Sequence, residues 1–283
     1  MNFPVKQKGA TLVELLISLV IGLIIAASML GIYVNSTANS SLILKSSKLN
    51  QELTSLMTVM VNDIRRAGYA GDFLGGVADN KFTYYDDGSD DKIRNVIRVD
   101  GSCILYAYNF DTSSDSTTDL ATPAYEDIRG FRLSLIPDTE IGVVEMLSMT
   151  GTAVTNIGDQ GYCAPTYNGD ADGDNVLDWQ PLTDHTTINI ETLEFDMGES
   201  SCLNLELGIN CRDYYTDYLG ITSTGAAPPF DEDIIHISNQ VGIQLSAKLV
   251  SDETTSLTIG DEDQPVYVKI RNDILWKGPL PSL

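Results

Sequence analysis

A short acidic segment holds the residues of this 283-residue chain that are best suited to bind a metal ion. Its aspartates follow the pattern D-x-D-x-D-x-x-x-D, and alternate side chains in such a tight loop converge on one centre. Hard cations such as Ca²⁺ take about six to eight oxygen ligands from carboxylates and backbone carbonyls. The sequence therefore predicts a calcium site in the loop 168–179. The predicted ligands are the side chains of Asp170, Asp172, Asp174 and Asp178 and the backbone carbonyl of Val176.

This loop resembles the calcium loops of extracellular repeats, and it departs from the EF-hand in two ways. Gly173 stands at the fourth loop position instead of the sixth, and Pro181 stands at the twelfth, where an EF-hand has Glu. An acidic turn without a metal is the alternative interpretation. Because four carboxylates within nine residues repel each other unless a cation neutralises them, we favour the calcium interpretation.

The four cysteines have a spacing that suits disulfides better than a metal or redox site. No CxxC pair occurs, which argues against a metal cluster and against a thioredoxin-like site. Among the pairings that four cysteines allow, we expect Cys202–Cys211, which encloses eight residues, together with Cys103–Cys163. Four free buried thiols are the alternative. A domain exported to the periplasm would meet the oxidising conditions in which disulfides persist.

Residues that would support catalysis or nucleic-acid binding are scarce. The sequence lacks the GxSxG, Walker and HExxH motifs, and its two histidines, His185 and His236, stand alone. His236 lies in an apolar Ile-Ile-His-Ile run, which is more typical of a sheet residue than of a catalytic base. Seventeen Lys and Arg against forty Asp and Glu give a net charge of −23, which excludes a general nucleic-acid binder. We therefore expect a protein that is not an enzyme.

Charge and hydropathy divide the chain into an N-terminal part with a long apolar run and a large acidic part, which contains the cysteines and the aspartate loop described above. Residues 1–72 contain six basic and four acidic residues, so residues 73–283 carry a net charge of −25. Thirty residues, 15–44, are uncharged, and Leu15–Val34 is densely apolar. As a helix this run of twenty residues spans about 30 Å, the thickness of the hydrocarbon core of a bilayer. A buried core helix is the alternative, but so long an uncharged stretch favours a membrane segment.

The residues around the start of this segment predict its orientation. Lys6 and Lys8 precede the apolar run, which places the N-terminus in the cytoplasm and the acidic part across the membrane. Glu14 lies at the edge of the run, where a carboxylate is unfavourable without a partner. It either marks the headgroup level of the span or has a function.

The segment Lys8-Gly9-Ala10-Thr11-Leu12-Val13-Glu14 and the uncharged span after it resemble the class III signal of type IV pilins and type II secretion pseudopilins. The resemblance implies that a prepilin peptidase removes the leader 1–9 by cutting after Gly9, and that the new N-terminus at Ala10 is methylated. An amine at Ala10 is mostly cationic at neutral pH. We expect Glu14 of a neighbouring subunit to pair with that amine in a filament core, which sets registry more than net stability.

The apolar pattern changes after this span. Six residues recur at steps of three and four, which predicts an amphipathic helix that packs on a head: Leu49, Leu53, Leu56, Met60, Ile64 and Ala67. Beyond Gly71 short β-type runs replace this period and predict an antiparallel sheet packed on the helix. The expected strands are Ile93–Val99, Ser102–Asn109, Arg129–Ile136, Val143–Met149, Thr187–Phe195, Ile234–Ile237, Val241–Val250 and Val266–Ile270.

The helix end Asp63-Ile64-Arg65-Arg66-Ala67-Gly68-Tyr69 is similar to that of the PilW family of type IV minor pilins. The likeness covers residues 6–72 well and the head only loosely. It implies an α+β, type IV pilin-like fold in which a long helix packs on an antiparallel, β-rich head. The expected parts are the leader, a membrane-spanning and filament-core helix over 10–34, its amphipathic continuation over 35–72, and the head over 73–283.

The same resemblance implies a minor pilin that takes part in pilus assembly, in a tip or priming complex. Its partners would be other minor pilins, the major pilin, the prepilin peptidase, the inner membrane and a tip adhesin. The protein would first lie in the bacterial inner membrane with its head in the periplasm, and then in the pilus, or fimbrium, at the cell surface. The alternatives are a J-type pseudopilin of type II secretion and a calcium-stabilised tip adhesin or ligand-binding module.

Overall fold

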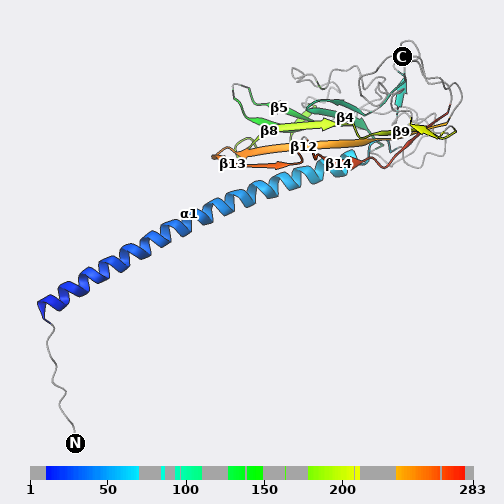
Figure 1. Cartoon of the computed structure of the whole chain (residues 1–283). Coiled ribbons are helices and arrows are strands. Elements are labelled where there is room, and N and C mark those ends of the chain that lie inside the picture. Colours follow the sequence, from blue (N-terminus) through cyan, green and yellow to red (C-terminus); the bar gives the residue numbers. More distant parts are fainter. Residues whose placement is uncertain are drawn as a thin grey trace, which may run out of the picture. The chain divides into compact units, whose positions relative to one another are not determined.

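The computed structural model divides into two compact units, Met1–Lys48 and Leu49–Leu283, which are described separately. The structure describes residues 11–69, 84–86, 93–95, 97–109, 127–137, 139–148, 163, 178–206, 208–210, 234–261 and 263–277. Helix α1, Leu12–Ile64, contributes to both units (Figure 1).

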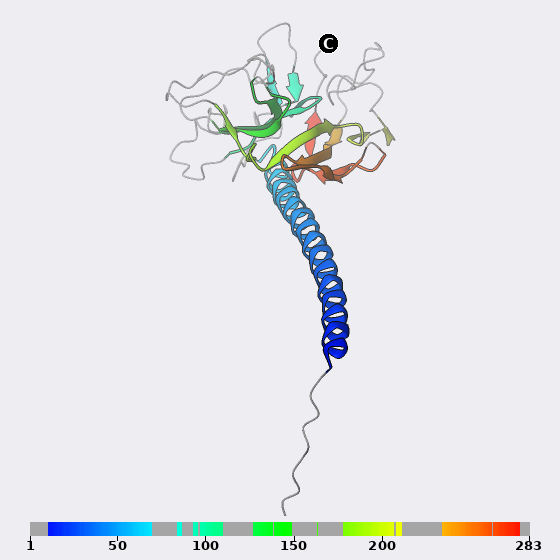
Figure 2. The ribbon, with the colours of Figure 1, turned by 90° about the vertical axis from the view of Figure 1, so that its left-hand side faces the viewer.

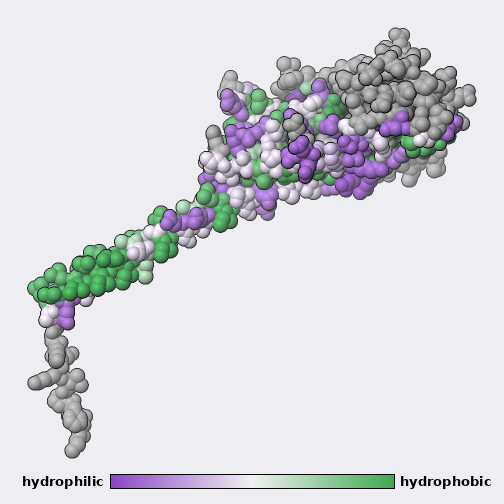
Figure 3. Space-filling model, viewed as in Figure 1, coloured by the Kyte–Doolittle hydropathy of each residue, from purple (hydrophilic) through white to green (hydrophobic). Residues whose placement is uncertain are grey.

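In the first unit the helix has no apolar neighbour. Every residue from Thr11 to Leu44 is exposed, and each large apolar side chain in this range is at least 50% exposed. Figure 3 shows the resulting apolar surface on this stretch of the helix. Among the described residues, α1 is the one helix long and apolar enough to cross a membrane, by length and composition alone. This agrees with the predicted span.

In the second unit the last turns of α1 belong to the core of the head. The predicted apolar stripe is buried, with Met57 in addition to the expected residues. The α-helix ends at Ile64, and turns continue to Gly68, which has a φ of 76°. The N–H groups of Arg66 and Ala67 bond three residues back and Gly68 turns left-handed, so the regular helix ends within the expected segment 35–72.

One sheet of the head has five strands in the order β3-β4-β5-β6-β7. All its pairings are antiparallel, as are the other strand pairs that the structure describes. Its strands are β3 Arg98–Asp100, β4 Cys103–Ala107, β5 Ile128–Leu135, β6 Gly142–Ser148 and β7 Trp179–Pro181. In Figure 2, β5 and β6 appear in green, apart from the orange strands of the next sheet.

The second sheet is built around the long strand β12. Strand β8 pairs with one edge of β12, and β13 and β14 share the other edge. Gly260 turns the chain between β13 and β14 with a φ of 72°, and a Cβ there would meet the carbonyl oxygen of Ile243 at 2.6 Å. The strands are β8 Ile188–Asp196, β12 Gln240–Leu249, β13 Asp252–Ile259 and β14 Val266–Lys269.

Two further sheets complete the described head. One has the order β10-β9-β11-β15, and the other consists of β1 and β2. Their strands are β1 Tyr84–Asp86, β2 Ile93–Asn95, β9 Ser201–Asn204, β10 Ile209–Asn210, β11 Ile234–Ser238 and β15 Ile274–Lys277. The predicted α+β, pilin-like fold, a long N-terminal helix with an antiparallel head, is confirmed.

The core of the head combines the helix stripe with residues of two sheets. Leu53, Met60 and Ile64 of α1 lie in one buried cluster with Tyr106 of β4 and Ile243 of β12, all of them fully buried. Burying a large apolar side chain contributes about 1.5–3 kcal/mol. The end of α1 is therefore a structural part of the head and not a linker to it.

Candidate functional site

The N-terminus of α1 carries a capping box made by Thr11 and Glu14. The Thr11 N–H and hydroxyl both donate to Glu14 Oε2, at 2.9 and 3.2 Å, and the Glu14 N–H donates to Thr11 Oγ1 at 3.3 Å. These bonds satisfy two N–H groups that a helix start leaves unpaired, and the carboxylate faces the positive end of the helix dipole. Glu14 was predicted as a site from its charge at the edge of the apolar run and from the resemblance to the class III signal. The signature T-x-x-E identifies the box as well.

The geometry leaves one carboxylate oxygen of Glu14 available. Both bonds to this carboxylate end on Oε2, and no group among the described residues donates to Oε1. Ala10, where the amine would be created, directly precedes Thr11 and lies outside the described residues, as does Gly9. A partner cation at this end of the helix can therefore bind Oε1 while the cap stays intact.

Three serine hydroxyls within the uncharged stretch of α1 form hydrogen bonds inside the helix. The hydroxyl of Ser18 donates to the carbonyl oxygen of Glu14 at 2.7 Å, and that of Ser28 donates to the carbonyl oxygen of Ile24 at 2.8 Å. Ser40 makes the same bond to Ser36. Such back-bonding lets a helix enter an apolar environment without unpaired donors.

A second site joins the end of α1 to the head. The hydroxyls of Tyr106 and Tyr108 donate to the two oxygens of Asp63, each at 2.6 Å. Burial, and then the neighbouring Asp63 carboxylate, raise the pKa of Tyr106 well above its ordinary value, and the same causes raise the pKa of Tyr108. This anchor was not predicted from the sequence, although Tyr-x-Tyr in a strand places both side chains on one face.

Comparison with protein families agrees with this arrangement. Residues 42–262 match the family model described as prepilin peptidase-dependent protein B, and residues 5–30 match the prokaryotic N-terminal methylation motif. The first match covers well over half of the chain. The chain belongs to the prepilin peptidase-dependent protein B family. No curated protein and no solved structure matches it.

Membership of the prepilin peptidase-dependent protein B family confirms a type IV minor pilin-like protein. The matched methylation motif spans Gly9, Ala10 and Glu14, and the long apolar helix follows it. Cleavage after Gly9 and methylation of Ala10 stay predictions, and so does the closer likeness to PilW.

One predicted disulfide of this family member is confirmed. Cys103, the first residue of β4, is bonded to Cys163, 60 positions further along the chain. Cys202 in β9 is buried and also disulfide-bonded, and Cys211, its predicted partner, lies outside the described residues. The alternative of four free thiols is wrong.

The predicted calcium loop is largely outside the described part of the chain. This holds for Asp170, Asp172, Asp174 and Val176. Asp178 is described: it is 1% exposed, and its backbone carbonyl accepts the N–H of Ser148 at 2.8 Å, next to the start of β7. Among the described residues no group of three or more His, Cys, Asp or Glu could hold a metal ion. The calcium site therefore stays a prediction.

Proposed function

We propose that this chain is a minor pilin that acts in type IV pilus assembly, in a priming or tip complex with other minor pilins. The observation that carries the proposal is the capped Glu14, whose Oε1 accepts no hydrogen bond from the described residues, at the start of a helix that is exposed from Thr11 to Leu44. Membership of a prepilin peptidase-dependent family supports it. The proposed role is structural, and His236 lies in β11, as predicted for a sheet residue, with Nε2 3.0 Å from an oxygen of Asp273.

The mechanism that we propose is lateral packing of helices after cleavage. Lipid tails are as apolar as Leu or Ile, so leaving the bilayer for a bundle brings little hydrophobic gain. Polar contacts within an apolar environment contribute about 0.6–2 kcal/mol each. The pair between Glu14 Oε1 and the Ala10 amine of a neighbour would therefore select one stagger of the helices among many of similar packing energy.

The partners and location follow from this mechanism. The precursor is held in the inner membrane by α1 with its head in the periplasm, and the prepilin peptidase exposes the amine. The processed chain then joins other minor pilins and the major pilin. A head that begins at Leu49 and fills most of the chain suits the end of a filament better than a repeated shaft position.

Glu14→Gln tests the proposal, because glutamine keeps the size and cap acceptor of this side chain but not its charge. We expect normal insertion of the variant in the inner membrane and at least about a tenfold loss from sheared pili, since the charged pair is missing. Glu52→Gln, a neutralisation in the same helix, is the control. Normal amounts of the Glu14→Gln protein in sheared pili would contradict the proposed pairing.

Deletion of the gene separates the alternatives. A priming role predicts loss of surface pili while the major pilin stays in the membrane. Normal pili with lost protein secretion would instead assign a J-type pseudopilin. Normal pili with lost surface attachment would favour a tip adhesin.

A further inference from the structure

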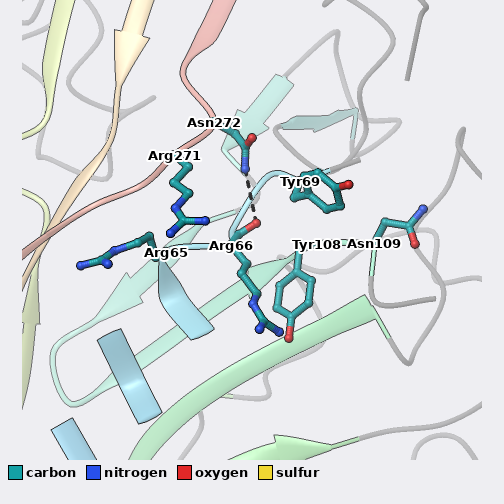
Figure 4. A pocket seen from close by; sticks show the side chains of 7 residues that line it. All are labelled: Arg65, Arg66, Tyr69, Tyr108, Asn109, Arg271 and Asn272. Carbon is teal, nitrogen blue, oxygen red and sulfur yellow. Dashed lines mark hydrogen bonds between the residues drawn. The ribbon is translucent and has the colours of Figure 1, made fainter. Parts of the chain in front are cut away.

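A pocket of about 480 Å³ lies at the end of α1 within the head (Figure 4). Three segments line it: the turn that follows Ile64, the two residues after β4, and the two residues after Ile270. Its most prominent side chains are three arginines and two tyrosines: Arg65, Arg66, Arg271, Tyr69 and Tyr108. This volume lies in the range of small-ligand sites, about 300–1,000 Å³.

The backbone around the pocket is fixed without the guanidinium groups. The Arg271 N–H donates to the carbonyl oxygen of Arg65 at 3.3 Å, and the Asn272 side-chain amide donates to that of Ala67 at 2.9 Å. The Asn109 N–H donates to the carbonyl oxygen of Tyr69 at 2.6 Å. These bonds hold the residues that follow the helix against the neighbouring segments, and the last helix carbonyls accept backbone N–H groups, so the arginine side chains are not needed as caps.

The charges of the three arginines are not neutralised by the described part of the chain. None of the three has an acidic partner within ion-pair distance there, and Arg66 instead lies 5.9 Å from the ring centre of Tyr108. Arg66 and Arg271 are exposed, and Arg65 is half-buried. Three of the seventeen basic residues thus gather around one pocket of a strongly acidic protein. Like charges repel, and a bound anion would relieve the repulsion between these arginines.

We propose that this pocket binds the carboxylate of an acidic side chain of a partner protein. The guanidinium fork binds planar carboxylates through paired hydrogen bonds, and the tyrosine rings provide an apolar wall beside the anion. The net charge of −23 repels large polyanions such as nucleic acid or an anionic membrane at long range. A single carboxylate on a partner that is already docked has a high effective concentration at the pocket. Its one charge is repelled much less than a large polyanion.

This inference goes beyond the pilus role and is tested without assembly. The probe is a fluorescein-labelled tetrapeptide of two Glu and two Tyr with an amidated C-terminus, added to the detergent-solubilised full-length chain at low salt. A matched peptide with Gln for Glu and the same amidated C-terminus reports binding that does not need acidic side chains. We expect the acidic peptide to bind at least about tenfold more tightly than the Gln peptide, because hydrogen bonds to charged groups are worth about 1.5–3 kcal/mol.

Variants locate the binding. Arg271→Gln and Arg65→Gln should each weaken the acidic peptide about tenfold. Lys248→Gln removes the same charge from β12, outside the pocket, and should change binding less than about twofold because surface ion pairs contribute little. The melting temperature of each variant verifies its folding. If one arginine variant does not fold, the other is enough for the test. Equal affinities for the two peptides, equal effects of the arginine and lysine variants, or tighter binding of inorganic phosphate than of the acidic peptide would overturn the proposal.

Discussion

The hydroxyl of Tyr106 donates a 2.6 Å hydrogen bond to Asp63, and this bond joins β4 to the last turn of α1. Tyr106 is fully buried, and Tyr108 donates to the other oxygen of the same carboxylate. The two tyrosine rings lie stacked with centroids 6.3 Å apart. One carboxylate thus fixes the angle at which the end of the helix lies on the first sheet of the head.

Removal of this carboxylate should destabilise the head. Asp63→Ala leaves the buried hydroxyl of Tyr106 without its acceptor, and we expect a loss of about 1.5–3 kcal/mol in the free energy of unfolding. Urea unfolding of the full-length chain in detergent, followed by near-UV circular dichroism, measures the change. Asn62→Ala, at an exposed position of the same turn, should stay within about 0.5 kcal/mol. A loss of the same size in both variants would contradict the anchor.

Alkaline pH should weaken the same anchor. Tyr106 and Tyr108 have raised pKa values in the folded head, mainly through burial and then through Asp63. Unfolded tyrosines lose their proton near pH 10, so the stability that these bonds provide is complete below that pH and is lost as the pH rises above it. Tyr106→Phe should be less stable than the wild type at about pH 8, and this difference should shrink towards about pH 11. Melting temperatures at both pH values give the result, and a constant difference would exclude the linkage.

The sequence predicted the elements whose burial follows a simple period. The apolar stripe of α1 has helical spacing, and the sequence from Gln244 onward alternates as the burial in β12 does. Strand β13 was missed because its residues Asp252–Ile259 are largely polar. Its place comes from pairing with β12, and its alternate residues Thr255, Leu257 and Ile259 are each partly buried.

The candidate sites also divide into those that a local sequence pattern predicts and those that it does not. The methylation motif and the Thr11–Glu14 cap are local and can be read from consecutive residues. The contact of Asp63 with Tyr106 joins positions 43 residues apart, and the arginine pocket joins Arg65 with Arg271, more than 200 residues away. No local pattern contains such contacts, because the fold of the sheets determines which loops meet at the end of the helix.

Loss of the confirmed disulfide should destabilise the five-stranded sheet. Cys103–Cys163 closes a long loop. Without this bond the unfolded chain has a higher conformational entropy, which favours unfolding. We expect Cys103→Ser combined with Cys163→Ser to lower the free energy of unfolding by about 2–5 kcal/mol. Ser102→Ala, beside the bond, is the control. Peptide mapping without reduction also tests the predicted Cys202–Cys211 pair, and a different partner for Cys202 would reject it.

Calcium should stabilise the head if the loop 168–179 binds it. Extracellular calcium sites have dissociation constants of about 10⁻⁴ to 10⁻³ M, so about 10 mM Ca²⁺ would add about 1–3 kcal/mol by linkage. The melting temperature of the chelator-treated chain should then rise by a few degrees on addition of Ca²⁺. Asp172→Ala removes a predicted central ligand and should abolish the rise, whereas Asp196→Ala, at an exposed position of β8, should keep it. A wild type that does not respond to Ca²⁺, or an Asp172→Ala variant that still responds, would leave the segment as an acidic turn. Because Asp178 is buried beside the start of β7, a bound ion would also fix the loop to the five-stranded sheet.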